Sequence, residues 1–174
     1  MASENHVEVR KAGSLSEEER ALINDWTQRL FGAAELEHEW ADPDWRILVW
    51  CTGALASHLA ICERVALAGG AEVKLAGIGS VMTPPEWQGR GLASAAMCRA
   101  AEFMRDELLA DFGFLLCSET LVPMYARLGW QVVPGPMVFA QSTGMETWHE
   151  AVMVLPCTAR DWPEGLIDLC GPPW

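Results

Sequence analysis

A glycine-rich turn in the middle of the chain has the residue types that bind a phosphate group. It spans residues 88–93, follows an apolar stretch that ends at 81–83, and precedes a run with helical spacing. Gly89 and Gly91 lack the Cβ atoms that would keep a ligand away from the main chain. The first N–H groups of the following helix are unpaired and lie at the positive end of its dipole. The turn therefore predicts an anion site, to which Arg90 adds a positive charge.

The position of the turn argues against two other phosphate-binding motifs. A dinucleotide fold has its glycine turn after the first strand, with an acidic residue about 20 positions further on. A triphosphate-binding loop has a lysine followed by serine or threonine. This turn lies in mid-chain and contains no such lysine, so we assign it to neither motif.

Hydrophobic periodicity around the turn predicts a mixed α/β fold. Val7 and Val9 alternate with polar residues as a first strand, and Ser16 with Glu19 forms a capping box that starts a helix reaching Leu30. Further strands are expected at 46–51, 54–65, 71–83, 112–117, 130–133 and 151–155, and further helices at 92–109 and 121–128. The strands between 46 and 83 are expected to form an antiparallel meander, followed by a helical crossover to a buried strand. The stretch between 133 and 151, rich in Gly, Pro, Ser and Thr, is expected to be a loop.

Length and composition indicate one globular domain, residues 1–174. The chain has 174 residues, 51% hydrophobic and 21% charged, and no apolar run long enough to span a membrane. No signal peptide is evident at the start, so a cytoplasmic location without a membrane partner is expected. The formal net charge of −12 argues against a nucleic-acid partner, and is compatible with a cationic ligand or simply with solubility. The six cysteines form no C-x-x-C pair, so we expect no metal site and reduced, buried thiols.

An acidic segment with tryptophans precedes the meander. Its carboxylates are Glu35, Glu37, Glu39, Asp42 and Asp44, interleaved with Trp40 and Trp45. Carboxylates beside aromatic rings suit a cationic acceptor such as a polyamine or an amino sugar. A solvated acidic loop whose tryptophans pack into the core is the alternative. The candidate acceptor-binding residues are Glu37, Glu39, Trp40, Trp148 and Trp174.

Two motifs in this order resemble the Gcn5-related N-acetyltransferase (GNAT) superfamily. Its Gln/Arg-x-x-Gly-x-Gly/Ala signature matches Gln88, Gly91 and Ala93. An apolar strand at 113–118 follows, and then a short helix that carries Tyr125 and ends in Leu-Gly-Trp. Within the superfamily the chain is similar to aminoglycoside 2′-N-acetyltransferases from about residue 39 onward. The resemblance implies a mixed, mostly antiparallel sheet of about six to seven strands with about four helices.

The resemblance also implies acetyl coenzyme A as the acetyl donor. Main-chain N–H groups of the glycine turn would hold the pyrophosphate, and the end of the preceding strand would pair with the pantetheine arm. The implied donor-binding residues are Val81, Met82, Thr83, Gln88, Gly89, Arg90, Gly91, Leu92 and Ala93. The implied reaction is direct transfer of the acetyl group to a primary amine of a small cationic substrate.

By the same resemblance, the Val81 N–H would stabilise the oxyanion and Tyr125 would protonate the leaving thiolate. The relatives carry a glutamate base two residues before the position of Val81, where this chain has Gly79. Glu119, His58 and the terminal carboxylate of Trp174 are candidate substitutes. His58 is equally well explained as a hydrogen-bonded core histidine, and Glu119 as a helix cap.

Other interpretations stay open at this stage. The acceptor is alternatively a protein or peptide amine or a metabolite amine, which the acidic segment permits equally. The missing glutamate also favours a non-catalytic module that binds coenzyme A. Homodimers are frequent in the superfamily, but no apolar stripe indicates a pairing surface. A covalent role for Cys117 is disfavoured because no histidine is spaced to activate it.

Overall fold

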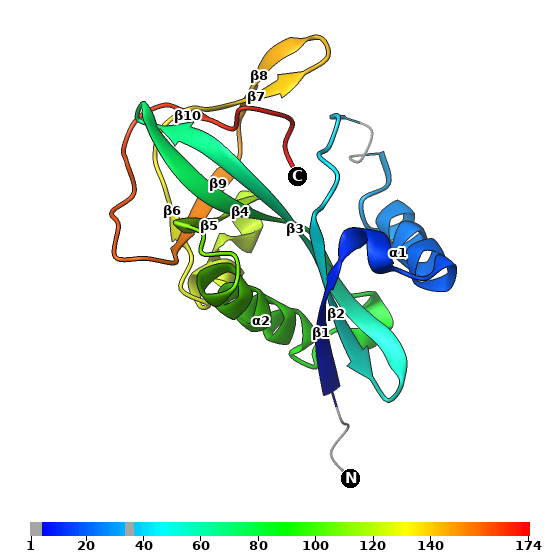
Figure 1. Ribbon diagram of the computed structural model, residues 1–174. Helices are drawn as coiled ribbons and strands as arrows, with labels where there is room; N and C mark the ends of the chain where they lie inside the picture. The colour runs from blue at the N-terminus through cyan, green and yellow to red at the C-terminus, as the bar shows by residue number, and fades with distance from the viewer. Residues whose placement is uncertain (1–4, 34–36) are drawn as a thin grey trace.

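The computed structural model of the protein describes residues 5–33 and 37–174. One curved sheet forms the centre, with α1 (Glu17–Leu30) against one face and α2 (Leu92–Asp106) against the other (Figure 1). The strands are β1 (Asn5–Lys11), β2 (Trp45–Cys51), β3 (Ala54–Ala68), β4 (Ala71–Met82), β5 (Phe112–Cys117), β6 (Gln131–Val132), β7 (Met137–Gln141), β8 (Gly144–Trp148), β9 (Ala151–Pro156) and β10 (Ile167–Asp168). A short helix, α3 (Val122–Ala126), follows β5.

The ten strands form one sheet that branches at β3. The main path is β6-β9-β5-β4-β3-β10-β7-β8, and β1 and β2 continue the sheet from the other half of β3. The pairs β4–β5 and β7–β10 are parallel, and all other pairs among the described strands are antiparallel. The predicted fold class, a mixed and mostly antiparallel sheet with helices, is confirmed.

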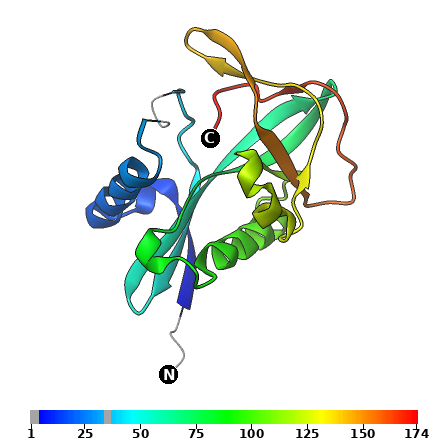
Figure 2. The ribbon, with the colours of Figure 1, turned by 180° about the vertical axis from the view of Figure 1, so that it is seen from behind.

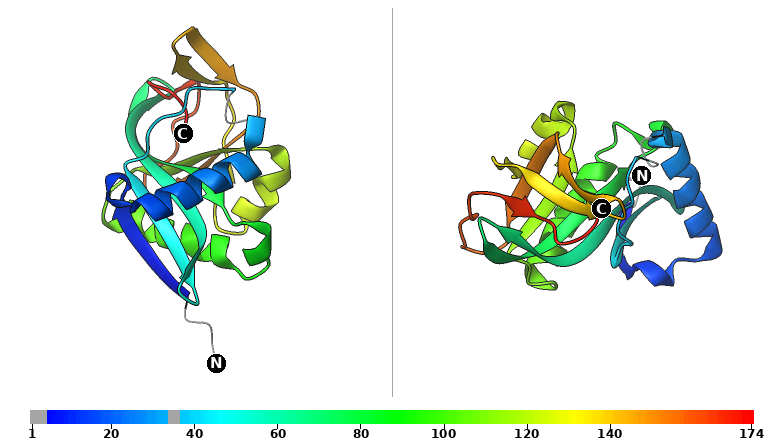
Figure 3. Two further views of the ribbon diagram at one scale, coloured as in Figure 1. Left: turned by 90° about the vertical axis from the view of Figure 1, so that its right-hand side faces the viewer. Right: turned by 90° about the horizontal axis from the view of Figure 1, so that it is seen from above.

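The two long helices pack on opposite faces of the meander because residues on β2 alternate between faces. Leu48 packs with Ile23 and Trp26 of α1, whereas Ile47 and Val49 belong to the cluster that α2 covers. Figures 2 and 3 show α1 and α2 on either side of the strands, from behind and from two further directions. The capping box predicted at the start of α1 is present, with both of its hydrogen bonds formed.

The numbers of strands and helices differ from those expected. The described residues contain ten strands and three α-helices, against about six to seven and about four. The prediction of a loop between 133 and 151 is wrong, because β7 and β8 form a hairpin there. Met137 and Phe139 alternate inward and are buried, a two-residue period that the surrounding Gly, Pro and Ser residues conceal.

The two later helices are shorter than predicted. The second long helix ends at Asp106, and Leu109 has a left-handed backbone with φ of 52°. The predicted helix at 121–128 is a 3₁₀ turn, Glu119–Leu121, followed by α3. None of the helices in the described ranges is long and apolar enough to span a membrane.

The acidic segment and the cysteines match their predictions in part. Residues 37–44 form no strand or helix, as expected, while Glu35 lies outside the described residues. Four cysteines are buried, but Cys98 and Cys170 are exposed, so the expectation of six buried thiols is wrong for these two.

Candidate active site

The parallel strands β4 and β5 separate partway along their length. Their pairing runs from Leu75 with Phe112 to Ile78 with Leu115 and then stops. Beyond this point β4 stays paired with β3 and β5 stays paired with β9. The edge of β4 at residues 79–82 therefore has no strand partner on the β5 side. Its unpaired polar groups are available to an extended ligand.

An irregularity in β4 lies at the same place. The ladder with β3 pairs Ala60 with Gly79 and His58 with Met82, and leaves Ser80 and Val81 without a partner. Ser80 has φ of 50°, a left-handed conformation that is unusual for a serine. This bulge changes the direction of the strand at the residues predicted to contact the thioester.

The glycine turn joins the unpaired end of β4 to α2. Gln88 donates from Nε2 to the Thr83 carbonyl at 2.9 Å, which fixes the turn against the strand end. Gly89 and Gly91 have φ of 73° and 74°, and a Cβ added at either would meet no atom within 4 Å. The left-handed backbone requires glycine there, while the space above it stays open. The start of α2 has no side-chain cap, so its first N–H groups are available to an anion.

Arg90 lies at the edge of this turn. Its guanidinium stacks over the Trp87 ring, with 4.9 Å from Cζ to the ring centroid. It also donates to the Glu86 carbonyl at 3.4 Å. The side chain is thus held beside the start of α2 and stays exposed, where it can add a counter-charge.

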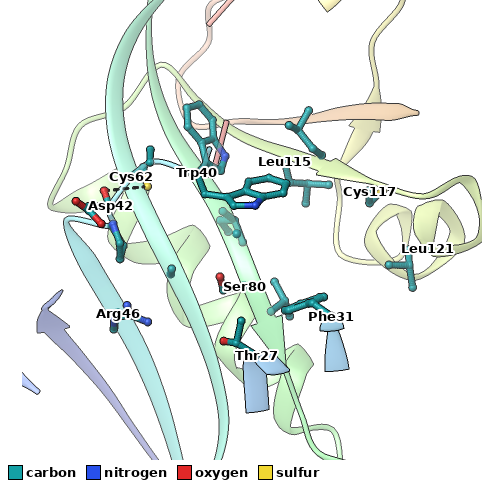
Figure 4. Close-up of a pocket in the computed structure, with 18 of the residues that line it drawn as sticks. Thr27, Phe31, Trp40, Asp42, Arg46, Cys62, Ser80, Leu115, Cys117 and Leu121 are labelled. Atoms are coloured by element: carbon teal, nitrogen blue, oxygen red, sulfur yellow. Dashed lines mark hydrogen bonds between the residues drawn. The ribbon is translucent and has the colours of Figure 1, made fainter. Parts of the chain in front are cut away.

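A cavity of about 580 Å³ opens on the α1 side of the β4–β5 gap. Figure 4 shows Arg46 and Ser80 on one side of it, Trp40 above, and Cys117 across from them. The residues that border it include Asn24 and Thr27 of α1, Trp40 and Asp42, Arg46 of β2, Gly79, Ser80 and Val81 of β4, Cys117 and Ser118, Tyr125, Trp148, Glu150 and Trp174.

Trp174 explains two glycines of β4. A Cβ added at Gly77 would lie 1.7 Å from the Trp174 ring, and one added at Gly79 would lie 2.7 Å from its main-chain carboxyl carbon. The ring is 8% exposed, and Arg64 holds the segment by donating to the carbonyls of Leu169 and Pro172. The main chain of Trp174 therefore fills the space that a side chain at position 79 would occupy.

Tyr125 reaches the cavity from α3. It is 5% exposed, its ring lies 6.5 Å from that of Trp130, and burial raises its pKa to about 12. The phenol is therefore protonated near neutral pH and can donate a proton. Burial, followed by the charges of Glu119 and Glu150, also raises the pKa of the neighbouring Cys117 thiol to about 11. This thiol stays protonated, which agrees with the disfavoured covalent role.

Of the nine predicted catalytic and acceptor-binding residues, five border the cavity together and four do not. Those that border it are Val81, Tyr125, Trp40, Trp148 and Trp174. Glu119 and Glu37 are exposed elsewhere, and His58 is buried beneath the cavity. Glu39 accepts hydrogen bonds from the Ser142 N–H and hydroxyl, which lower its pKa and tie the acidic segment to the β7–β8 hairpin.

The sequence did not indicate four polar residues that border the cavity. Asn24 and Thr27 come from α1, Arg46 comes from β2, and Glu150 directly precedes β9. The elements that contain or adjoin these residues were predicted. Hydrophobic periodicity does not indicate, however, that α1 and β2 lie beside the β4–β5 gap. The alternation of Arg46 with the buried Ile47 and Val49 was the available signal that its side chain faces α1.

The comparisons with known proteins agree with this geometry. Residues 14–133 match the sequence model of a family described as Acetyltransferase (GNAT) domain. The chain is 28% identical over 130 residues to an aminoglycoside 2′-N-acetyltransferase of Mycolicibacterium fortuitum. That match covers 69% of this chain and 66% of the relative, slightly less than two thirds of its length.

Solved structures show the same fold. The Escherichia coli GNAT family N-acetyltransferase YhbS, in complex with CoA, has a TM-score of 0.65 at 12% identity, covering 98% of this chain and 92% of that one. Escherichia coli ElaA has a TM-score of 0.63 at 14% identity, covering 87% and 99%. A GNAT family acetyltransferase from Brucella melitensis, in complex with acetyl-CoA, has a TM-score of 0.59 at 19% identity, covering 93% and 94%.

Proposed function

Since the chain belongs to the GNAT acetyltransferase family, we propose that it transfers an acetyl group from acetyl coenzyme A to a primary amine of a small molecule. The observation that carries the proposal is the continuity of the site. The glycine turn continues from the unpaired end of β4, and the same strand end borders the cavity that contains Tyr125. We propose that residues 1–174 act as one domain in this reaction.

The residues present suit the donor. Acetyl coenzyme A, when bound, supplies an activated acyl group on a thioester. The open left-handed glycines and the uncapped start of α2 suit its diphosphate, with the N–H groups of Gly89–Ala93 as donors. The unpaired edge of β4 at Val81–Thr83 suits the amides of its pantetheine arm.

Two groups have chemistry that suits acyl transfer. The Val81 N–H belongs to the unpaired edge of β4, where a fixed main-chain donor can stabilise negative charge that develops on the carbonyl oxygen. Tyr125 keeps its proton near neutral pH and can protonate the departing thiolate.

The acceptor ammonium also needs a base. We propose Glu150, which borders the cavity and acts through water, in place of Glu119, which does not border it. Trp174, whose main chain lies over Gly79, stays a candidate from the sequence. A Glu150→Gln variant tests this assignment: we expect its acetylation rate to fall at least tenfold at pH 7, with partial recovery at higher pH. An unchanged rate and pH profile would contradict it.

The experiment that tests the function mixes the protein with acetyl coenzyme A and a panel of amines while free thiol is followed. The panel holds aminoglycosides, which the curated relative suggests, together with polyamines, amino acids and peptides. We expect thiol release with at least one small amine. Turnover of peptides alone would favour a protein acetyltransferase. Donor binding without turnover of any amine would favour a non-catalytic module.

A further inference from the structure

Among the described residues, the guanidinium of Arg46 borders the cavity without an ion-pair partner. Arg46 borders the cavity from β2, and its Nε atom is buried without a hydrogen-bond partner. Within residues 5–33 and 37–174, no carboxylate oxygen lies within 4.0 Å of its guanidinium nitrogens. Burial lowers the pKa of Arg46, but an arginine stays charged in proteins. A half-buried charge that lacks an anionic partner is costly, so its presence calls for an explanation.

Neutral His58 orients this guanidinium without cancelling its charge. Arg46 Nη1 donates to His58 Nε2 at 2.8 Å, and His58 Nδ1 donates to the Ser80 carbonyl at 3.1 Å. Burial and then the charge of Arg46 lower the pKa of His58 to about 3, so the ring is uncharged near neutral pH. Since His58 occupies Nη1, the donors left are Nε and Nη2. These two form a side-on fork that matches the two oxygens of a carboxylate.

The strand register places Arg46 in one row across the sheet with Gly79, which lies at the β4–β5 gap. Arg46 pairs with Ala60 on β3, and Ala60 pairs with Gly79 on β4, so the three residues share one face. Neighbouring strands lie about 4.8 Å apart, and Ala60 and Gly79 have little or no side chain. The long Arg46 side chain can therefore extend over β3 toward the place where the acceptor meets the thioester (Figure 4).

The other charges around the cavity do not replace this missing partner. Asp42 and Glu150, which border the cavity, are exposed, and Asp42 lies at its edge (Figure 4). The charge of Asp42 opposes the lowering of the Arg46 pKa, but burial has the larger effect and Asp42 forms no ion pair with Arg46. Glu39 is engaged by Ser142 on the β7–β8 hairpin. Arg20, a second cation near Arg46, is exposed on α1 and donates to the Leu15 carbonyl. The main-chain carboxyl group of Trp174 lies over Gly79 at the β4–β5 gap, and no ion pair joins it to Arg46. Among the described residues that border the cavity, Arg46 is the only cation, and its Nε and Nη2 are left for a ligand.

We propose that Arg46 binds a carboxylate of the acceptor, so that the acceptor is a small molecule carrying both a primary amine and a carboxylate, as an amino acid does. The amine then lies toward Tyr125 and the β4–β5 gap, and the carboxylate toward β2. This inference rests on the proposed function and narrows its acceptor to zwitterions, in preference to polycations such as aminoglycosides. His58 is then a positioning residue that acts through Arg46.

Matched pairs of acceptors test the inference. Phenylalanine is compared with phenethylamine and lysine with cadaverine, each with acetyl coenzyme A, because each pair differs only in the carboxylate. We expect kcat/KM to be at least tenfold higher for the amino acid of the preferred pair. Equal or higher kcat/KM for the decarboxylated amines would overturn the inference and leave the proposed function standing.

Two variants test whether the preference for an acceptor with a carboxylate depends on Arg46. Arg46→Gln keeps a donor for His58 but loses the charge and the fork, so we expect KM for the amino acid to rise about tenfold to a hundredfold, with the amine unchanged. Arg20→Gln removes an exposed charge nearby and should leave both acceptors unchanged. An equal loss for amino acid and amine in Arg46→Gln would contradict the assignment.

Thermal melting provides a readout that needs no turnover. In the presence of the preferred amino acid, the wild-type midpoint should rise, and the Arg46→Gln midpoint should not. If no amine releases thiol, the proposed function fails, and this shift still decides whether Arg46 binds the carboxylate. No shift in the wild type with any amino acid of the panel would overturn the inference.

Discussion

The donor-binding and acceptor-binding regions proposed above are formed by different kinds of atoms. The donor region is almost all main chain, and its residues lie within one continuous stretch, 81–93. The acceptor region is made by side chains from α1, the segment at 40–43, β2, β5, β8 and the end of the chain. A main-chain site depends on conformation and tolerates many side chains, whereas a side-chain site changes with each substitution. We therefore expect donor binding to be common to proteins of this fold, and acceptor binding to depend on the side chains of each protein.

The largest effect should come from a substitution at Gly91 that disrupts binding of acetyl coenzyme A by the main chain. Gly91→Glu places bulk and negative charge at the start of α2, where φ is 74°. We expect KM for acetyl coenzyme A to rise at least about a hundredfold because the anion site is lost. Gly91→Asn is the matched control, since asparagine tolerates a left-handed backbone and adds no charge. A Gly91→Glu enzyme with wild-type donor affinity would remove this turn from the donor site.

The next largest effect should come from Tyr125, which lies where the proposed donor-binding and acceptor-binding regions meet. Tyr125→Phe removes the hydroxyl that we assign to the leaving thiolate, and we expect kcat to fall at least about tenfold. Donor affinity should stay within about twofold of wild type, because the main-chain contacts are untouched. Single-turnover acetylation and calorimetry measure the two quantities separately. An unchanged kcat would exclude Tyr125 from proton transfer.

A substitution that displaces the Trp174 ring should affect acceptor binding and leave donor binding intact. Gly77→Ala places a Cβ 1.7 Å from the Trp174 ring, so the ring must move. We expect the free energy of unfolding to drop by about 1–3 kcal/mol and the acceptor KM to rise several-fold, with donor affinity retained. Gly13→Ala, where a Cβ would meet no atom within 4 Å, is the control. A loss of donor affinity in Gly77→Ala would show that the two regions are not separate.

The stability of the fold should also depend on pH through His58. His58 has a pKa of about 3 in the folded protein against 6.5 for a free side chain, because of burial and the nearby Arg46. The unfolded chain therefore binds the extra proton between these values. The stabilisation is complete above about pH 6.5 and decreases as the pH falls toward 3.

Thermal melting between pH 7.5 and 4.5 measures this slope. His58→Gln should show a shallower decline than wild type, since the titrating group is gone, whereas the exposed His6→Gln should follow wild type. Identical slopes for wild type and His58→Gln would show that His58 is not held neutral in the fold.

The difference between local patterns and contacts of distant segments explains how much could be predicted from the sequence. The glycine turn, the strand before it and the capping box are local patterns, and each was found at its place. The β7–β8 hairpin and the position of Trp174 over Gly77 depend on packing between segments far apart in the chain. No local periodicity records such contacts, so Arg46 and Glu150 were missed and Glu39 was assigned to the acceptor pocket.

The most direct test of the central claim is a calorimetric titration of the purified protein with acetyl coenzyme A, alongside Gly91→Glu. The claim is that the turn at 88–93 and the gap between β4 and β5 together bind the acetyl donor. It predicts saturable heat with one site per wild-type chain, and a loss of that heat in the variant. No heat from the wild type, or the same heat from both proteins, would contradict it.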